Sequence, residues 1–180
     1  MLVDSDSTGE ISFSSFVQVL KKLRIEFDEQ EMRETVMLFS SSAPFFRYKD
    51  FLSALVGTPN RTRTEVIKRI FEKLDKENKG YITLNCLRFG YIPGQNSKCR
   101  LGLRSESSLL SEFLDAVEYF FVLFGEGNGN SLRISFPSFL SFFSLLSFAV
   151  ADDEIFQLDV QREWGLTNLA LTGKYKNREN

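Results

Sequence analysis

The sequence predicts an all-α protein of two lobes. Each lobe pairs two helix–loop–helix units through a short β-bridge, and an extra helix follows at the C-terminal end. Two observations predict this fold. Apolar residues recur at helical spacing along most of the 180 residues, and polar loops interrupt them. One apolar residue in each of the first three polar loops, at positions 11, 46 and 82, recurs at intervals of 35 and 36 residues, as expected for a repeated unit.

The first loop, residues 4–15, follows the register of an EF-hand calcium loop, and Gly9 permits its sharp turn. The residues in ligand register are Asp4, Asp6, Thr8 and Glu10, the last through its backbone carbonyl. Position 12 holds Ser15 where a bidentate Glu belongs, so we expect calcium to bind at ~1 mM or more weakly, against roughly 10⁻⁷–10⁻⁵ M for sensors. The alternative is a turn held by its own aspartate hydrogen bonds and Gly9.

The third loop, residues 75–86, keeps the shape of the first loop and less of its chemistry. Asp75, Glu77 and Gly80 fit the register. Lys79 stands where an oxygen should point at the ion, and Cys86 replaces the closing Glu. Because a cation at Lys79 opposes a bound cation, we expect Ca²⁺ to bind weakly at best, with no ion bound as the ordinary state.

The second and fourth loops show only in outline, at residues 40–50 and 125–138. Phe46 and Ile134 can take their β-bridge positions, and neither loop has an acidic pair in ligand register. Ile134 follows Ile82 by 52 residues, which is longer than the repeat period. The additional residues are expected in an inserted loop at 92–107, which is rich in Pro, Gly, Ser and Asn.

Helix start signals place the remaining elements. Asp28 and Glu31 form a capping box, Thr64 can cap the next helix, and Ser107 or Ser108 opens another. The expected layout is an N-terminal lobe at 1–57, a linker at 58–63, a C-terminal lobe at 64–166 that includes a final helix at 152–164, and a polar tail at 167–180.

Composition excludes several functions. The net charge of −2 gives no electrostatic reason to bind nucleic acid or a membrane surface. The absence of histidine removes the usual general base and the commonest zinc ligand, and no nucleophile or phosphate-loop motif is present, so no enzyme is expected. Cys86 and Cys99 form no CxxC pair, and we expect two reduced thiols of a cytoplasmic protein, with a single disulfide as the alternative. The N-terminus has neither a basic nor an apolar leading segment, so no signal peptide is expected.

Two apolar faces are candidate partner surfaces. The first hand has almost no entering helix before Asp4, so its apolar side is expected to lack the usual cover. The Phe-rich helix at 136–150 is apolar on more faces than one lobe needs. The candidate partner-binding residues are Phe13, Phe16, Leu20, Phe139, Phe143 and Leu146. The alternative for the second face is that the final helix folds back over it.

The chain resembles the calcyphosin family of two-lobed, four-EF-hand proteins. The resemblance lies in the segment Glu65–Tyr91, in the long insertion before the fourth hand, and in the ending Asp152–Leu166 with its tryptophan. The family implies calcium binding at its loops, and relatives of this type also occur in ciliary doublet microtubules. Carried over by position, the implied metal ligands are Asp4, Asp6, Thr8, Glu10, Ser12, Asp75, Glu77, Tyr81 and Thr83.

The resemblance and the eroded loops together favour a structural or adaptor protein. We expect a component of a ciliary or other cytoskeletal assembly, with tubulin or other axonemal proteins as possible partners, which the basic residues Lys174, Lys176 and Arg178 could touch. The alternative is a weak calcium sensor that works through the first hand. Position 12 of the loops separates the two hypotheses.

Overall fold

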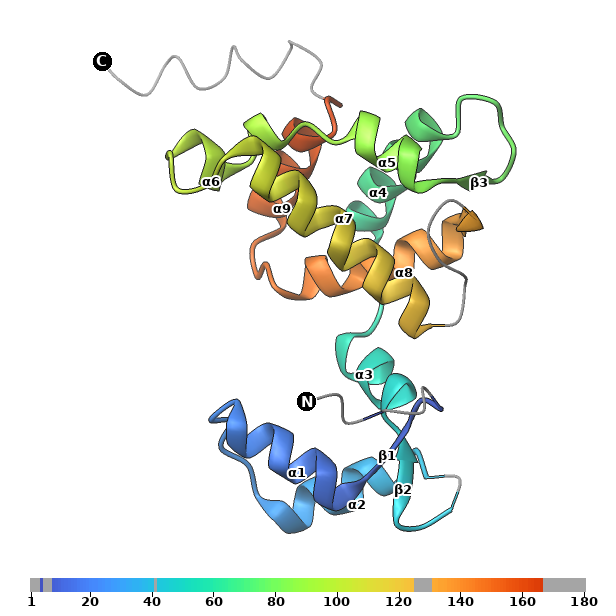
Figure 1. Cartoon of the computed structure of the whole chain (residues 1–180), viewed down its shortest axis with the longest axis vertical. Coiled ribbons are helices and arrows are strands. Elements are labelled where there is room, and N and C mark those ends of the chain that lie inside the picture. Colours follow the sequence, from blue (N-terminus) through green and yellow to red (C-terminus); the bar gives the residue numbers. More distant parts are fainter. Residues whose placement is uncertain (1–3, 5–7, 41, 125–130, 167–180) are drawn as a thin grey trace. The chain divides into compact units, whose positions relative to one another are not determined.

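The computed structural model describes residues 4, 8–40, 42–124 and 131–166. The chain divides into two compact units, Met1–Gly57 and Thr58–Asn180 (Figure 1). The described residues are mostly helical, and the strands are short and paired. The all-α EF-hand fold with short β-bridges is therefore confirmed.

The first unit contains three helices and one antiparallel strand pair. Ile11 lies opposite Phe46 in that pair, as the repeat period predicts. Asp28 caps the middle helix, because its Oδ1 accepts a hydrogen bond from Glu31 N at 2.8 Å. The elements in order are β1 (Glu10–Ser12), α1 (Phe13–Lys22), α2 (Glu29–Met37), β2 (Phe45–Arg47) and α3 (Tyr48–Val56).

The apolar side of α1 is covered within its own unit. Phe16 is only 9% exposed, and its ring meets Phe46 and Phe51 edge to face, with centroids 5.3 and 5.6 Å apart. Phe13 and Leu20 are buried as well. The expectation that this side lacks cover is therefore wrong, because β2 and α3 supply apolar side chains that helical periodicity in α1 cannot reveal.

The second unit contains the remaining elements. Its strands pair antiparallel with Ile82 opposite Ile134, so the long interval between these residues is taken up by an insertion, as predicted. The elements are α4 (Arg61–Leu74), β3 (Tyr81–Ile82), α5 (Leu84–Gly90), η1 (Pro93–Gln95), α6 (Ser97–Arg100), α7 (Glu106–Leu123), β4 (Ile134–Ser135), α8 (Phe136–Phe148) and α9 (Asp153–Glu163).

Two helices of this unit begin earlier than the sequence predicts. Asn60 caps α4 by accepting a hydrogen bond from Arg63 N at 3.0 Å, whereas the hydroxyl of Thr64 donates to Pro59 O. Ser105 caps α7 in the same way and displaces the two predicted serines. The second half of the expected linker at 58–63 is consequently the first turn of α4.

The insertion at 92–107 is more ordered than a loop. It contains η1 and α6, and it is bonded to the end of α9. Ile92 N donates to Glu163 O at 2.7 Å, and Asn96 Nδ2 donates to Glu163 Oε1 at 2.6 Å. The insertion therefore helps to position α9.

The final helix folds back into the core of the second unit, as the alternative interpretation of the Phe-rich helix expected. Phe139 and Phe143 of α8 are each 1% exposed, and both contact the ring of Trp164. The two phenylalanines therefore face the interior. Among the described residues, no helix is both long enough and apolar enough to cross a bilayer.

Candidate functional site

The carboxylate of Asp4 organises the first loop. Its Oδ1 accepts a hydrogen bond from Thr8 N at 2.9 Å, and its Oδ2 accepts one from Gly9 N at 3.0 Å and one from the Tyr48 hydroxyl at 3.0 Å. Gly9 adopts a φ of 80°, which permits the turn. Lys49 also packs here, since its side chain lies 3.4 Å from where a Cβ on Gly9 would be. Lys49 therefore adds a positive charge beside this turn.

Two serines close the first loop. Ser12 caps α1, because its Oγ accepts from Ser15 N at 3.1 Å and lies 2.9 Å from Ser15 Oγ. Its hydroxyl thus serves the helix, and the short side chain of Ser15 offers no carboxylate at position 12. Glu10 lies in β1, where its backbone carbonyl is the implied ligand. Asp6, another predicted ligand, lies outside the described residues.

In the third loop a lysine pairs with one of the predicted carboxylate ligands. Asp75 accepts from Lys79 N and Gly80 N through its two oxygens, each at 2.8 Å. The Lys79 ammonium lies 2.7 Å from Glu77 Oε2, and its hydrogen bond and attraction to that carboxylate raise the pKa of Lys79. Asp75 thus bonds to the backbone of its own loop, and its two oxygens keep lone pairs that a cation could use. Glu77 is the predicted ligand that already has a cationic partner, Lys79.

The far end of the third loop serves helix α5. Thr83 is its N-cap, and Thr83 Oγ1 lies 3.4 Å from both the backbone N and the Sγ of Cys86. Tyr81 lies in β3, with the guanidinium of Arg133 4.9 Å from its ring centroid. The side chain of Cys86 has no oxygen and cannot supply the two that the closing Glu provides. The residues of this loop do not fit a calcium ion.

The described residues of the second loop add no ligand set. Asp50, at the end of the second loop, pairs with Arg47 at 3.1 Å. The fourth loop's residues 125–130 lie outside the described part of the chain. Across the residues that are described, no three His, Cys, Asp or Glu side chains come together to hold a metal ion.

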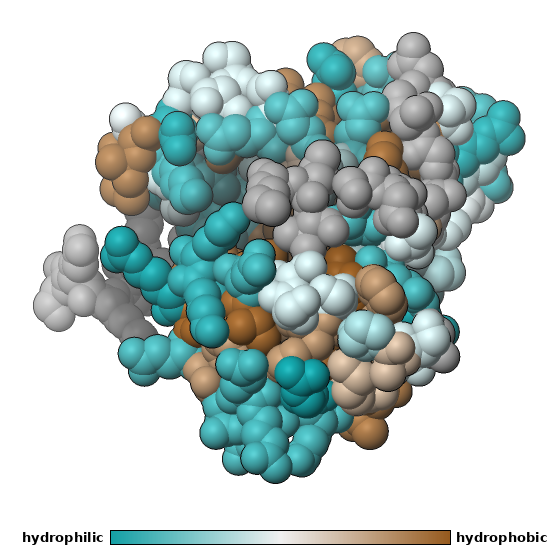
Figure 2. All heavy atoms as spheres, turned by 60° about the horizontal axis from the view of Figure 1, so that its bottom comes forward, coloured by the Kyte–Doolittle hydropathy of each residue, from teal (hydrophilic) through white to brown (hydrophobic). Residues whose placement is uncertain are grey.

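The predicted partner-binding residues divide sharply by exposure. Five of them are buried and belong to the core of their own unit, so they offer no surface to a partner: Phe13, Phe16 and Leu20 in the first unit, and Phe139 and Phe143 in the second. Leu146 is 40% exposed. Figure 2 shows one face of the molecule, on which hydrophobic and polar side chains are interspersed. Other exposed apolar side chains of the second unit include Phe89, Leu101, Leu103, Tyr119, Val122, Leu145 and Phe148.

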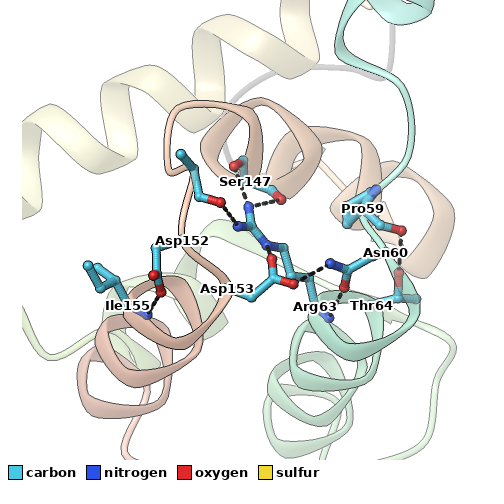
Figure 3. A network of polar contacts seen from close by, with 9 residues as sticks. Pro59, Asn60, Arg63, Thr64, Ser147, Asp152, Asp153 and Ile155 are labelled. Carbon is cyan, nitrogen blue, oxygen red and sulfur yellow. Dashed lines mark hydrogen bonds and ion pairs between the residues drawn. The ribbon is translucent and has the colours of Figure 1, made fainter.

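Sequence reasoning missed the polar network around Arg63. This arginine of α4 is buried, and it bonds to Ser147 at the end of α8 and to Asp153 at the start of α9 (Figure 3). One sequence signal could have revealed it. Arg63 stands three and four residues before Val66 and Ile67 on the apolar stripe of α4, where a charged side chain requires a buried partner.

Paired helix–loop–helix units joined by two-stranded bridges define the class: this is a protein of EF-hand fold. No protein-family model matches the chain. The chain is similar to troponin C isoforms 2A and 2B of Homarus americanus, at 29% identity over 87 residues, which are 46% of this chain and 58% of each relative. It is also similar to crustacean calcium-binding protein 23 of Faxonius limosus, at 21% identity over 163 residues, 90% of this chain and 77% of the relative.

These matches support a distant relationship to EF-hand proteins. The matched region spans 58% of the troponin C chains, so what those whole proteins do is not carried over to this chain. None of the relatives named here bears on the calcyphosin-like assignment, which stays a prediction.

Proposed function

We propose that this chain is a non-enzymatic EF-hand protein that works as a folded protein-interaction module, with its second unit independent of calcium. The observation that carries the proposal is the ion pair between Lys79 and Glu77, at 2.7 Å inside the third loop. The Lys79 ammonium puts a positive charge beside Glu77, one of the predicted ligands, and repels a second cation there. A loop that contains its own cation gains little from a second one.

The closing position of both acidic loops supports the same proposal. Ser15 and Cys86 occupy it, so each loop lacks two carboxylate oxygens and one negative charge. The extensive cores also favour a constitutive fold. Each unit buries its own apolar cluster, and that burial stabilises the helices without an ion.

The finer assignment is a structural or adaptor component of a ciliary doublet microtubule or another cytoskeletal assembly. It rests on the calcyphosin-like segments, and the proposed partners are tubulin or other axonemal proteins. The apolar side chains that remain exposed on the second unit, Leu146 among them, are the available contact points.

A second candidate function is weak calcium binding at the first loop. Asp4 and Thr8 stand in ligand register, and the matched protein from Faxonius limosus is named a calcium-binding protein. The loop would then use Asp4, Thr8 and the Glu10 carbonyl, and its affinity would be limited by Ser15.

A calcium titration tests the proposal. At about 1 µM free calcium we expect no change in helix content or melting temperature, because a ligand stabilises by RT ln(1 + [L]/Kd), which vanishes when Kd far exceeds the ligand concentration. Calorimetry on the full chain should show no site tighter than about 1 mM. A rise of several degrees at that calcium concentration would replace the proposed function with the calcium sensor.

A further inference from the structure

The turn that ends α6 exposes two leucines among basic side chains. Leu101 and Leu103 are 72% and 68% exposed, and the cations on either side of them are exposed as well. In Figure 1, α6 lies at the edge of the second unit, on the side away from β3 and the third loop. Five residues form this basic–apolar turn: Lys98, Arg100, Leu101, Leu103 and Arg104.

Hydrogen bonds fix the backbone of the basic–apolar turn. Gly102, with a φ of 69°, donates to Cys99 O at 2.9 Å, and Leu103 N donates to Lys98 O at 2.9 Å. This pair of bonds is the Schellman motif, in which the residue at the position of Leu103 frequently packs against an apolar side chain in the last turn of the helix. Lys98 and Ser97 occupy the positions that would supply this contact, so α6 gives Leu103 no apolar cover.

Both ends of the turn are anchored to the second unit. On the N-terminal side, Asn96 Nδ2 donates to Glu163 Oε1 of α9 at 2.6 Å. On the C-terminal side, Ser105 caps α7, and Arg104 pairs with Glu112 of α7 at 3.5 Å. Because the turn is already ordered, a partner that binds it has little conformational entropy to remove, which favours affinity.

The charges of the turn indicate what it can bind. Neither Lys98 nor Arg100 forms an ion pair with a described residue, and both are exposed. With Arg104 they place three cations around two leucines. A guanidinium binds a carboxylate through two parallel hydrogen bonds, and an exposed leucine is covered by another apolar side chain. The complementary ligand therefore combines carboxylates and apolar side chains within a short stretch.

We propose that the basic–apolar turn is a docking surface for an acidic segment of a partner protein, in which carboxylates are interspersed with apolar side chains. The inference deepens the proposed function and rests on it, since it names the surface and the chemistry of the partner. The carboxylates of the segment bind the three cations of the turn, and its apolar side chains cover Leu101 and Leu103.

Two acidic side chains beside the turn favour a peptide over a lipid surface. Glu112 pairs with Arg104, and the carboxylate of Glu106 lies against Gly94 of η1, where a Cβ would be 2.7 Å from Glu106 Oε1. A flat anionic membrane would bring its phosphates toward these carboxylates as well as toward the cations, and the carboxylates would repel them. A narrow peptide can contact the cations and pass beside the acids.

The experiment uses the full chain and a fluorescently labelled peptide in which pairs of glutamates alternate with single leucines. We expect fluorescence anisotropy to show binding tighter than about 1 mM that weakens with added salt, because exposed charges are screened. Arg100→Glu should weaken binding about tenfold, since an attraction becomes a repulsion. Leu103→Ser should weaken it about fivefold, since an apolar contact is lost.

Two controls make the result specific. Arg69→Glu makes the same change in net charge at an exposed position of α4, and it should bind the peptide as the wild-type chain does. A peptide with lysine in place of each glutamate should not bind the wild-type chain, because its charges would face the cations of the turn.

Three outcomes would overturn the inference. The peptide could fail to bind, or Arg100→Glu could weaken binding no more than Arg69→Glu does, which would leave only an effect of net charge. The chain could also bind vesicles of phosphatidylserine and phosphatidylcholine through Arg100 while it ignores the peptide, which would make the turn a lipid-binding surface. Failure of the proposed function is seen separately, as a calcium-induced rise in melting temperature of the wild-type chain without peptide.

Discussion

Lys79 places its ammonium nitrogen 2.7 Å from Glu77 Oε2, so the residue at position 5 of the third loop neutralises the residue at position 3. Both positions carry oxygen ligands in a calcium-binding EF-hand loop. Glu77 therefore already has a cationic partner, and an approaching calcium ion would have to displace it. This relationship separates the third loop from the first, in which position 5 keeps an oxygen-bearing side chain, that of Thr8.

Restoring the closing carboxylate should act differently on the two loops. Ser15→Glu should give the first loop measurable calcium affinity, tighter than that of the wild-type chain by about tenfold or more, because a bidentate carboxylate returns. Cys86→Glu alone should gain much less, because Lys79 still opposes the ion. Calorimetric titration of each variant with calcium measures both effects.

The contribution of Lys79 itself is tested by a double change. Cys86→Glu combined with Lys79→Asn should bind calcium more tightly than Cys86→Glu alone, whereas Cys86→Glu combined with Lys76→Asn, a neighbouring lysine of the same loop, should not. A tight site in the Cys86→Glu variant would show that the interpretation of Lys79 is wrong.

Local patterns in the sequence were sufficient to predict the two β-bridge pairings and one helix cap. The pairing of Ile11 with Phe46 and of Ile82 with Ile134 was predicted, because the bridge position is set by a short loop motif that repeats along the chain. The cap at Asp28 was predicted for the same reason, since it depends on residues three positions apart.

Contacts between distant residues were not predictable in this way. The bond from Arg63 to Asp153 joins residues 90 positions apart, and no periodicity connects them. The burial of Phe16 was missed because its cover comes from Phe46 and Phe51, which belong to the other half of the same lobe. Helical periodicity shows which face is apolar, and only the fold shows what covers that face.

Two carboxylates at the ends of α9 should give opposite pH dependences of the free energy of unfolding. Hydrogen bonds from Arg63 and Asn60 lower the pKa of Asp153 below its usual 3.8, so its stabilising contribution is present above that value and is lost as the pH falls through the folded-state pKa. Burial raises the pKa of Glu163 above 4.5. The stabilising contribution of Glu163 to the free energy of unfolding is therefore present below pH 4.5 and is lost as the pH rises through its folded-state pKa.

Urea denaturation at a series of pH values checks both signs. Relative to the wild-type chain, Glu163→Gln should gain stability as the pH rises above 4.5, because a neutral amide keeps the oxygen that accepts from Asn96 and cannot ionise. Asp153→Asn should be less stable than the wild-type chain near neutral pH, and this difference in the free energy of unfolding should disappear as the pH falls below 3.8. A relative stability of Glu163→Gln that declines with rising pH would contradict the assignment.

Removing the guanidinium of Arg63 should destabilise the second unit. Arg63→Ala leaves Ser147 O and the Asp153 carboxylate without this donor and opens space beside Phe156, so we expect a loss of about 3 kcal/mol in the free energy of unfolding. Arg61→Ala changes an exposed arginine in the same turn of α4 and should cost no more than about 0.5 kcal/mol. Equal effects of the two variants in urea denaturation would show that the network around Arg63 contributes little.

The last prediction separates a core residue from a candidate contact residue on the same helix. Phe143→Asp should unfold the second unit, because it places a charge in a core where the side chain is 1% exposed. Leu146→Asp should leave the fold intact, since that side chain is 40% exposed, at a cost of about 1 kcal/mol. If α8 contributes to a cytoskeletal interface, the Leu146→Asp chain should remain monodisperse and folded yet co-sediment less with doublet microtubules than the wild-type chain. Ser141→Asp, an exposed polar position on α8, is the matched control and should co-sediment as the wild-type chain does. Co-sedimentation that is absent for the wild-type chain, or unchanged by Leu146→Asp, would remove α8 from the proposed interface.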